Sequence, residues 1–238
     1  MIPQAIADAL GRIELQAQDV FGGFEPGFEP ADSRAMLRNA GSAPSLDPLS
    51  VVAPDGAYFV AENGSGVTFS RDGSLTFDDG TLRARDGAQI LGYGAGSKEP
   101  LPLRADPLDI ALGRVGNPRI DRDGTLSYQR SSLDPRTGER RFERVSVGRI
   151  ALARFPAGTQ PLRRDAVHVV APRGVTPAIG RAGESGTGSL TPFARDLGRI
   201  DMAAGLDRLQ EAYLSFEALR TAGQARAGLE RGAMDLVK

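Results

Sequence analysis

The spacing of apolar residues changes twice along this chain of 238 residues, and this change constrains the fold more than any other feature of the sequence. Before residue 23 and after residue 193, large apolar residues recur every three or four positions, which is typical of amphipathic helices. Between residues 51 and 192, short β-like runs are separated by Gly, Asp and Pro, which is typical of strands joined by turns. The sequence therefore predicts a mainly β fold, with one central all-β domain at residues 51–192 bracketed by N- and C-terminal amphipathic helices that pair.

Residues 1–22 are predicted to form one helix, and residues 23–50 a linker that contains a duplicated Gly-Phe-Glu-Pro. An isolated helix of this length is marginally stable in water, so its apolar face needs a partner. The N-terminal apolar stripe consists of Ile2, Ile6, Leu10, Ile13 and Val20.

Residues 193–238 are predicted to form a second helix, because apolar residues from 202 to 216 are spaced 4, 3, 4 and 3 apart, as in a coiled-coil heptad. Glycines at positions 205, 223, 228 and 232 weaken it as a lone helix, each by about 1 kcal/mol relative to Ala. We therefore expect both terminal stripes to act as assembly interfaces, within one chain or between subunits. The C-terminal stripe consists of Met202, Leu206, Leu209, Tyr213 and Phe216.

The composition argues against several classes of protein. The chain has no cysteine, so it can form neither a disulfide nor a thiolate metal site. Its 29 basic and 30 acidic side chains nearly cancel, which disfavours a nucleic-acid partner. No apolar run approaches the roughly 18 residues of a transmembrane helix, so we expect no membrane insertion. The N-terminus lacks the basic and apolar regions of a cleaved secretion signal.

A sequence pattern that occurs twice in the chain predicts two structural turns. The pattern Arg-Asp-Gly-(Ser/Thr)-Leu-(Thr/Ser)-aromatic occurs at residues 71–77 and 122–128, and Asp-Gly supplies the positive φ that tight hairpins need. We therefore assign Asp72-Gly73 and Asp123-Gly124 to turns. The second copy also begins like a calcium loop at Asp121, but it lacks acidic residues at the fifth and twelfth positions, which favours a turn over an ion site.

No set of residues predicts catalysis convincingly. His168 is the only histidine and follows Asp165, while Ser185 lies in a Gly-rich segment that is one residue short of a nucleophile elbow. A structural histidine is favoured over a hydrolase triad, and neither a cofactor nor a metal is predicted. A cluster of basic residues alternates with acids, which favours a solvated hairpin tip over a nucleic-acid contact. This cluster consists of Arg136, Arg140, Arg141 and Arg144.

Six blocks of the β region carry a further signal because they occur in a fixed order. They are GAYFV at 56–60, VTFSRDGSLTF at 67–77, GTLRARDGAQILG at 80–92, and the blocks at 120–127, 147–156 and 183–190. Taken together, they resemble the flagellar basal-body rod and hook protein family. Members of that family usually carry an Asn-rich motif after the first helix and Ser-Asn-Val-Asp before the last one. Residues 23–28 and 199–202 stand at those places here, without asparagine.

The resemblance implies a structural axial subunit of the bacterial flagellar basal-body rod, without enzymatic activity. It implies terminal helices that pair into an inner tube while the β domain packs outside. The implied partners are copies of the chain, other flagellar rod and hook proteins, and the flagellar export apparatus. The implied location is the rod that spans the periplasm, reached without a cleaved signal peptide. Two alternatives stay open, a secreted β-domain binding module and, less favoured, a hydrolase that uses His168.

Overall fold

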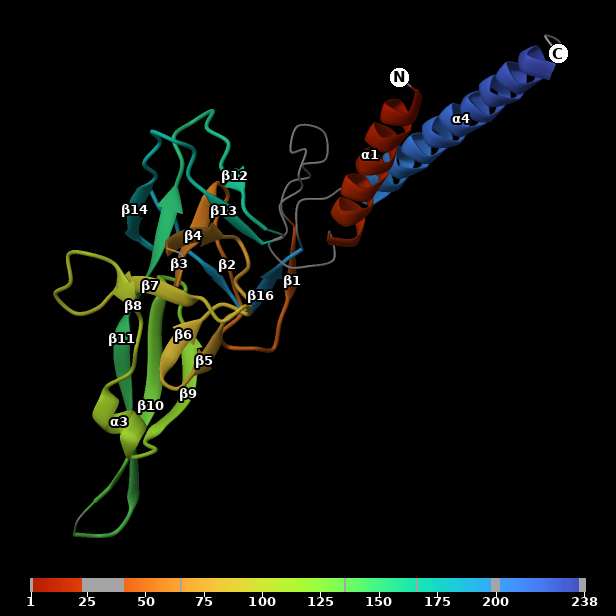
Figure 1. Cartoon of the computed structure of the whole chain (residues 1–238). Helices are drawn as coiled ribbons and strands as arrows, with labels where there is room; N and C mark the ends of the chain where they lie inside the picture. The colour runs from red at the N-terminus through yellow and green to blue at the C-terminus, as the bar shows by residue number, and fades with distance from the viewer. Residues whose placement is uncertain are drawn as a thin grey trace. The chain divides into compact units, whose positions relative to one another are not determined.

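The computed structural model describes residues 2–22, 41–64, 66–134, 136–165, 167–197 and 202–235 (Figure 1). They form two compact units, a helical unit that contains the first and last helices and a β unit that contains the strands. Strands make up most of the regular structure, and a helix lies at each end of the chain. The prediction of a mainly β chain with a terminal helix at each end is therefore confirmed.

The helical unit contains α1 (Ile2–Gly22) and α4 (Met202–Asp235), which contact each other. The start of α4 lies nine residues beyond the start predicted from the sequence, because residues 194–196 form a strand. Among the described helices, none combines the length and the apolar character that crossing a bilayer requires.

In the described part of the β unit, the strands pair in antiparallel fashion. The strands are β1 (Ser42–Pro44), β2 (Val51–Val52), β3 (Ala57–Asn63), β4 (Gly66–Ser70), β5 (Thr76–Asp78), β6 (Thr81–Arg83), β7 (Gln89–Tyr93), β8 (Leu101–Pro102), β9 (Val115–Ile120), β10 (Thr125–Leu133), β11 (Arg140–Arg154), β12 (Leu162–Arg163), β13 (His168–Val170), β14 (Ala178–Arg181), β15 (Thr191–Pro192) and β16 (Ala194–Asp196).

The main sheet runs in the order β12-β13-β4-β3-β11-β7-β6-β5, and β8, β9, β10 and β14 pair off this path. Two separate ribbons, β1–β16 and β2–β15, lie outside it, so strands occur on both sides of the predicted range 51–192. The longest strands, β10 and β11, form a hairpin that projects from the rest of the β unit (Figure 1). The predicted cluster of basic residues lies at the exposed end of this hairpin.

Both faces of the central strands are buried. On β3, Phe59 packs in one hydrophobic cluster, and its neighbours Tyr58 and Val60 pack in another. On β11, Ile150 and Ala151 divide between the same two clusters. Successive strand residues point to opposite faces, so a strand covered on both sides reads as a continuous apolar run instead of an alternating one.

The two copies of the seven-residue pattern, at residues 71–77 and 122–128, have different surroundings. Gly124 has a φ of +79° and caps a turn in which the Thr125 N–H donates to the Asp123 carboxylate. Gly73 is instead required by close approach, since a Cβ there would lie 1.7 Å from the Val51 carbonyl oxygen. Only the second copy therefore uses its glycine for a positive φ.

A short helix, α3 (Pro107–Ala111), precedes the long hairpin. Its start is fixed locally, because the Asp106 side chain accepts a hydrogen bond from the Leu108 N–H and Pro107 occupies the first turn.

Candidate functional site

The predicted stripe on α1 divides between buried and exposed positions. Val20 is 3% exposed, Ile6 and Ile13 are half-buried, and Leu10 is 44% exposed. Ala9 is buried in place of Leu10. The side chain of Ile2 lies outside the described residues. A helix presents residues three and four apart on one face, so the inward face of α1 is centred one residue before Leu10.

The predicted stripe on α4 divides in the same way. Leu209 and Phe216 are half-buried, whereas Leu206 and Tyr213 are 52% and 55% exposed. The prediction on Met202 concerns a side chain outside the described residues. The half-buried apolar positions and one glycine repeat with spacings of three and four, and they are Leu209, Ala212, Phe216, Leu219 and Gly223. The predicted C-terminal stripe therefore includes both half-buried and exposed positions of α4.

A polar cavity of about 250 Å³ lies between the two helices of this unit. Arg12 and Gln16 line it from α1, and Glu211 and Ser215 line it from α4. Among the described residues, the buried Gln16 Oε1 has no hydrogen-bond partner. Polar residues in a helix seam favour one register over others at some cost in stability.

A buried ion pair fixes the strand that leads out of the β unit. Arg71, at the end of β4, lies 3.0 Å from the Asp196 carboxylate on β16, and both side chains are 1% exposed. The guanidinium also donates to the carbonyl oxygens of Ala57 at 2.9 Å and Ala53 at 3.3 Å. Because Asp196 pairs with Ser42 of β1, this contact anchors the ribbon through which the chain enters and leaves the β unit.

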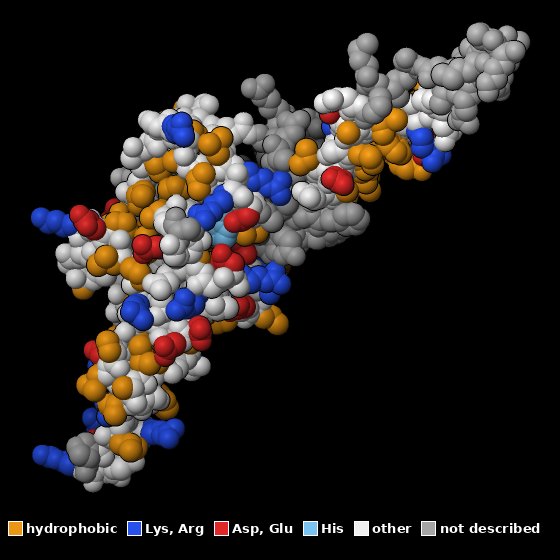
Figure 2. Space-filling view, viewed as in Figure 1, with side chains coloured by type: hydrophobic (Ala, Val, Ile, Leu, Met, Phe, Trp, Pro, Cys, Tyr) orange, Lys and Arg blue, Asp and Glu red, His pale blue; other side chains and the backbone are white. Residues whose placement is uncertain are grey.

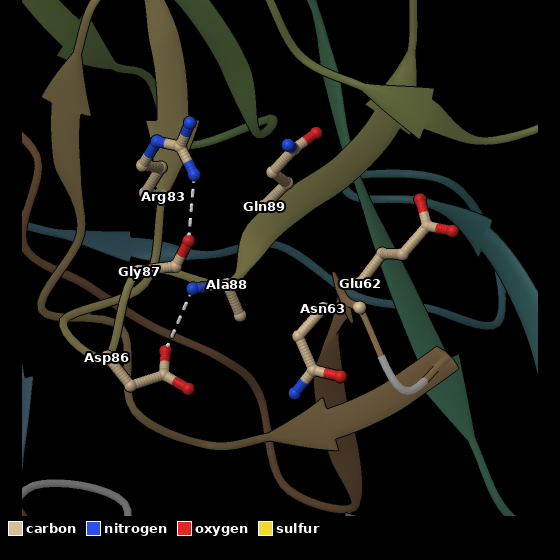
Figure 3. Close-up of a pocket in the computed structure, with 8 residues that line it drawn as sticks. Glu62, Asn63, Arg83, Asp86, Gly87, Ala88 and Gln89 are labelled. Atoms are coloured by element: carbon tan, nitrogen blue, oxygen red, sulfur yellow. Dashed lines mark hydrogen bonds between the residues drawn. The ribbon is translucent and has the colours of Figure 1, made fainter.

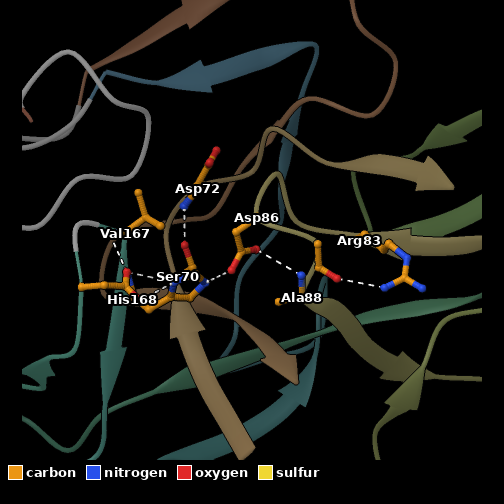
Figure 4. Close-up of polar contacts among 9 residues, drawn as sticks. Ser70, Asp72, Arg83, Asp86, Ala88, Val167 and His168 are labelled. Carbon is orange, nitrogen blue, oxygen red and sulfur yellow. Dashed lines mark hydrogen bonds and ion pairs between the residues drawn. The ribbon is translucent and has the colours of Figure 1, made fainter. Parts of the chain in front are cut away.

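His168 contacts two carboxylates, those of Asp165 and Asp86, and Figure 4 labels the second of them. Its Nδ1 is 3.0 Å from Asp165 Oδ1, and its Nε2 is 3.5 Å from Asp86 Oδ2. Partial burial raises the pKa of Asp165, but hydrogen bonds from the Val167 and His168 N–H groups and the neighbouring imidazole outweigh it, so this pKa is lowered. The described contacts of the ring are therefore with acids, and the exposed Ser185 is not among them.

Asp86 also lines a depression of about 490 Å³ (Figure 3). Its walls are the end of β3, with Glu62 and Asn63, and the turn between β6 and β7. Arg83 donates to the Gly87 carbonyl at 2.9 Å, and Asp86 accepts the Ala88 N–H at 3.1 Å. Arg83 and Asp86 are thus engaged in holding the backbone of this turn.

A third polar cluster ties α3 to the long hairpin. The buried Tyr128 hydroxyl donates to Asp109 Oδ2 at 2.6 Å, and Arg130 bridges toward Asp109 and Glu143. Burial, together with the hydrogen bond and charge of Asp109, raises the pKa of Tyr128 to about 12. Within the described ranges, no group of three or more His, Asp or Glu side chains is arranged to hold a metal ion.

Sequence reasoning missed the exposed Leu15 and Leu214 on the terminal helices and the Arg71–Asp196 pair. The sequence contained a signal for Leu15 and Leu214, because both are apolar residues that lie off the predicted helical stripes. Nothing in the sequence marks Arg71 as different from Arg122, its exposed counterpart in the second copy. Comparison of the sequence with protein-family models and with curated proteins found no match.

Proposed function

We propose that this chain is a structural, non-enzymatic axial subunit of the bacterial flagellar basal-body rod. It assembles through its terminal helices with copies of itself and with other flagellar rod and hook proteins. The ordered sequence blocks of the β region support the choice of family. One observation carries the assembly: the two helices contact each other and still expose large apolar side chains on their outer faces.

These exposed side chains occur on both helices. Leu10 and Leu15 of α1 are 44% and 52% exposed, and Leu206, Tyr213 and Leu214 of α4 are 52%, 55% and 60% exposed. Hydrophobic side chains gather on the visible face of the helical unit in Figure 2. Amphipathic helices of a self-contained protein usually keep their outer face polar, so apolar residues on both faces favour burial in a larger assembly.

The energetic gain from assembly is distributed over several side chains. Full burial of a Leu or Phe side chain contributes about 1.5–3 kcal/mol, so covering the exposed half contributes about 1 kcal/mol for each. Each subunit contributes five such side chains, so the free energy of association grows with every neighbouring subunit that covers some of them. The inward faces hold the helix pair together while the outward faces meet the neighbouring subunits.

The β unit acts as the outer body of the subunit in this proposal. It has its own two hydrophobic clusters, and its entry and exit strands are paired and anchored by Arg71 and Asp196. Export occurs through the flagellar export apparatus without a cleaved signal peptide, and no cofactor takes part.

The test replaces outward apolar residues by charges. We expect Leu206→Asp/Tyr213→Asp to keep its circular-dichroism spectrum, to sediment as a monomer at concentrations where the wild-type chain associates, and to be absent from isolated basal bodies. The matched control is Leu101→Asp/Leu162→Asp, because these β-unit side chains are 58% and 54% exposed. Normal incorporation of the first variant would refute the proposal.

Phe216→Asp separates the two helix faces, because Phe216 belongs to the half-buried inward set. We expect this variant to lose helical signal as well as association, since a charge in the seam disrupts the pair itself. If the chain is instead a secreted binding module, substitutions on either face of the helix pair should leave association unchanged.

A further inference from the structure

The ring of His168 links two segments of the β unit that are distant in the sequence. His168 is the only histidine of the chain, and it is buried. Its backbone on β13 pairs with Ser70 of β4, and the turn between β6 and β7 brings Asp86 to the ring (Figure 4). The imidazole therefore stands between β13 and this turn.

The two ring nitrogens have different surroundings. Nδ1 lies 3.0 and 3.1 Å from the two carboxylate oxygens of Asp165, which also accepts the backbone N–H of His168 at 2.8 Å. Nε2 lies 3.5 Å from Asp86 Oδ2, is enclosed by protein, and has no hydrogen-bond partner among the described residues. Because the Asp165 contact is the closer one, a ring with a single proton carries it on Nδ1.

The charge of the ring decides whether its contact with Asp86 is attractive. With a proton on each nitrogen, the imidazolium donates to Asp165 and attracts Asp86. With one proton on Nδ1, the lone pair of Nε2 faces the Asp86 carboxylate, and two acceptors that face each other in an enclosed site are destabilising. Histidine is the side chain that exchanges these two forms between about pH 5 and 8.

The other charged side chains on the neighbouring elements have partners of their own. Asp72, which follows β4, accepts a backbone N–H of its own turn at 2.8 Å. Arg163 of β12 donates to a carbonyl oxygen of the turn before β13 at 3.0 Å, and Arg83 of β6 donates to a carbonyl oxygen of its own turn at 2.9 Å. Arg85 and Arg164, which lie in these two turns, also have partners. The described charged contacts of the ring are therefore the two carboxylates.

We propose that His168 is a clamp operated by a proton: the imidazolium holds the β6–β7 turn against β13 through Asp86, and loss of the Nε2 proton releases the turn. The clamp is closed at the acidic end of the range over which histidine titrates and open at the alkaline end.

Release of the turn changes the depression of about 490 Å³, because Asp86, Gly87 and Ala88 form part of its wall (Figure 3). Asp86 Oδ1 accepts the Ala88 N–H at 3.1 Å, so a carboxylate that moves away from the ring displaces the backbone of this wall. The proton on one ring nitrogen thus sets the shape of the depression. This inference concerns the β unit alone and does not depend on the proposed function.

The test is an NMR titration of the full chain, in which the single histidine makes the ring signals unambiguous. Between about pH 5 and 8, we expect the Gly87 and Ala88 amide signals to shift with the same midpoint as the ring. His168→Gln should abolish this response of the turn, which would show that it does not come from titration of a carboxylate.

Asp86→Asn separates the ring from the turn. The Asn side chain can accept from a protonated Nε2 through its oxygen or donate to an unprotonated Nε2 through its amide, so the ring should still titrate while the turn amides no longer follow it. The matched control is Asp79→Asn, which changes an exposed acid in the β5–β6 turn and should leave the coupling as in the wild type.

Three results would overturn the inference. The first is a ring that does not change its charge between about pH 5 and 8. The second is a wild-type titration in which the turn amides do not follow the ring. The third is coupling that survives in Asp86→Asn as it does in Asp79→Asn. None of these results bears on incorporation into basal bodies, so failure of the clamp and failure of the proposed function are distinguishable.

Discussion

Removing the Arg71 guanidinium should destabilise the β unit more than any exposed arginine does. Arg71→Met keeps the apolar stem of the side chain but takes away the ion pair that the buried Asp196 carboxylate forms with the guanidinium. The carbonyls of Ala53 and Ala57 also lose the donors at 3.3 and 2.9 Å. Breaking one side of a buried ion pair costs about 3–5 kcal/mol, a large fraction of the roughly 5–15 kcal/mol that holds a typical domain together.

The second copy of the repeated seven-residue pattern supplies the control. Arg122 occupies the same place in the second copy of the seven-residue pattern, and it is exposed. Arg122→Met should therefore change the free energy of unfolding by no more than about 0.5 kcal/mol. Both variants should be unfolded in urea and followed by the β signal in circular dichroism, and Arg71→Met should also lower the melting temperature by about 10 °C.

A second variant separates the charge from the packing. Arg71→Met/Asp196→Leu removes both charges, so it should recover much of the loss, because two apolar side chains of similar volume replace a buried pair at little cost. Equal stability of Arg71→Met and Arg122→Met would refute the reasoning. A double variant no more stable than Arg71→Met would show that the lost carbonyl contacts, and not the buried Asp196 carboxylate, dominate the loss.

Three further predictions concern single side chains. Gly124→Ala should destabilise the β unit by about 1–3 kcal/mol in urea unfolding, because its φ is +79° and a Cβ would lie 2.4 Å from the Ala182 Cβ. Asp165 has a lowered pKa in the folded chain, so its contribution to the free energy of unfolding is present at neutral pH and is lost as the pH falls through that pKa. The difference in the free energy of unfolding between wild type and Asp165→Asn should therefore shrink below about pH 4. A difference that stays constant with pH would contradict this. Tyr128→Phe leaves the buried Asp109 without its hydroxyl donor and should cost about 1–3 kcal/mol, and an ultraviolet titration should find one tyrosine that resists ionisation until about pH 12.

The elements of the fold were predictable where a local pattern carries them. The helix α1 begins and ends within a residue of its predicted limits, because its apolar spacing alone defines it. The change to strands near residue 51 was equally visible. The ribbon of β1 and β16 was not, because its residues lie about 150 positions apart and neither strand has an apolar pattern of its own.

The candidate surfaces were predictable only in part. Heptad spacing identified Leu206 and Tyr213 as apolar helix residues, but it could not tell the face toward α1 from the face toward solvent. That distinction depends on the partner helix, which packs small residues such as Ala9 into the seam. In the same way, the seven-residue pattern that begins Arg-Asp-Gly occurs twice, and it is the long-range contacts of Arg71, with Asp196 and with the Ala53 and Ala57 carbonyls, that bury the first arginine.

Pairing of β1 with β16 also changes the order in which the chain can fold. In the unfolded chain, α1 and α4 are separated by roughly 180 residues, and closing so long a loop is entropically costly. Once the β unit has formed, Ser42 and Asp196 are neighbours, and only roughly 25 residues beyond that ribbon separate the two helices along the chain. Three halvings of loop length lower the closure cost by about 2 kcal/mol. The helix pair should therefore form after the β unit, as the closing of a short loop, and cutting the ribbon should slow the pairing of two helices to which it contributes no residue.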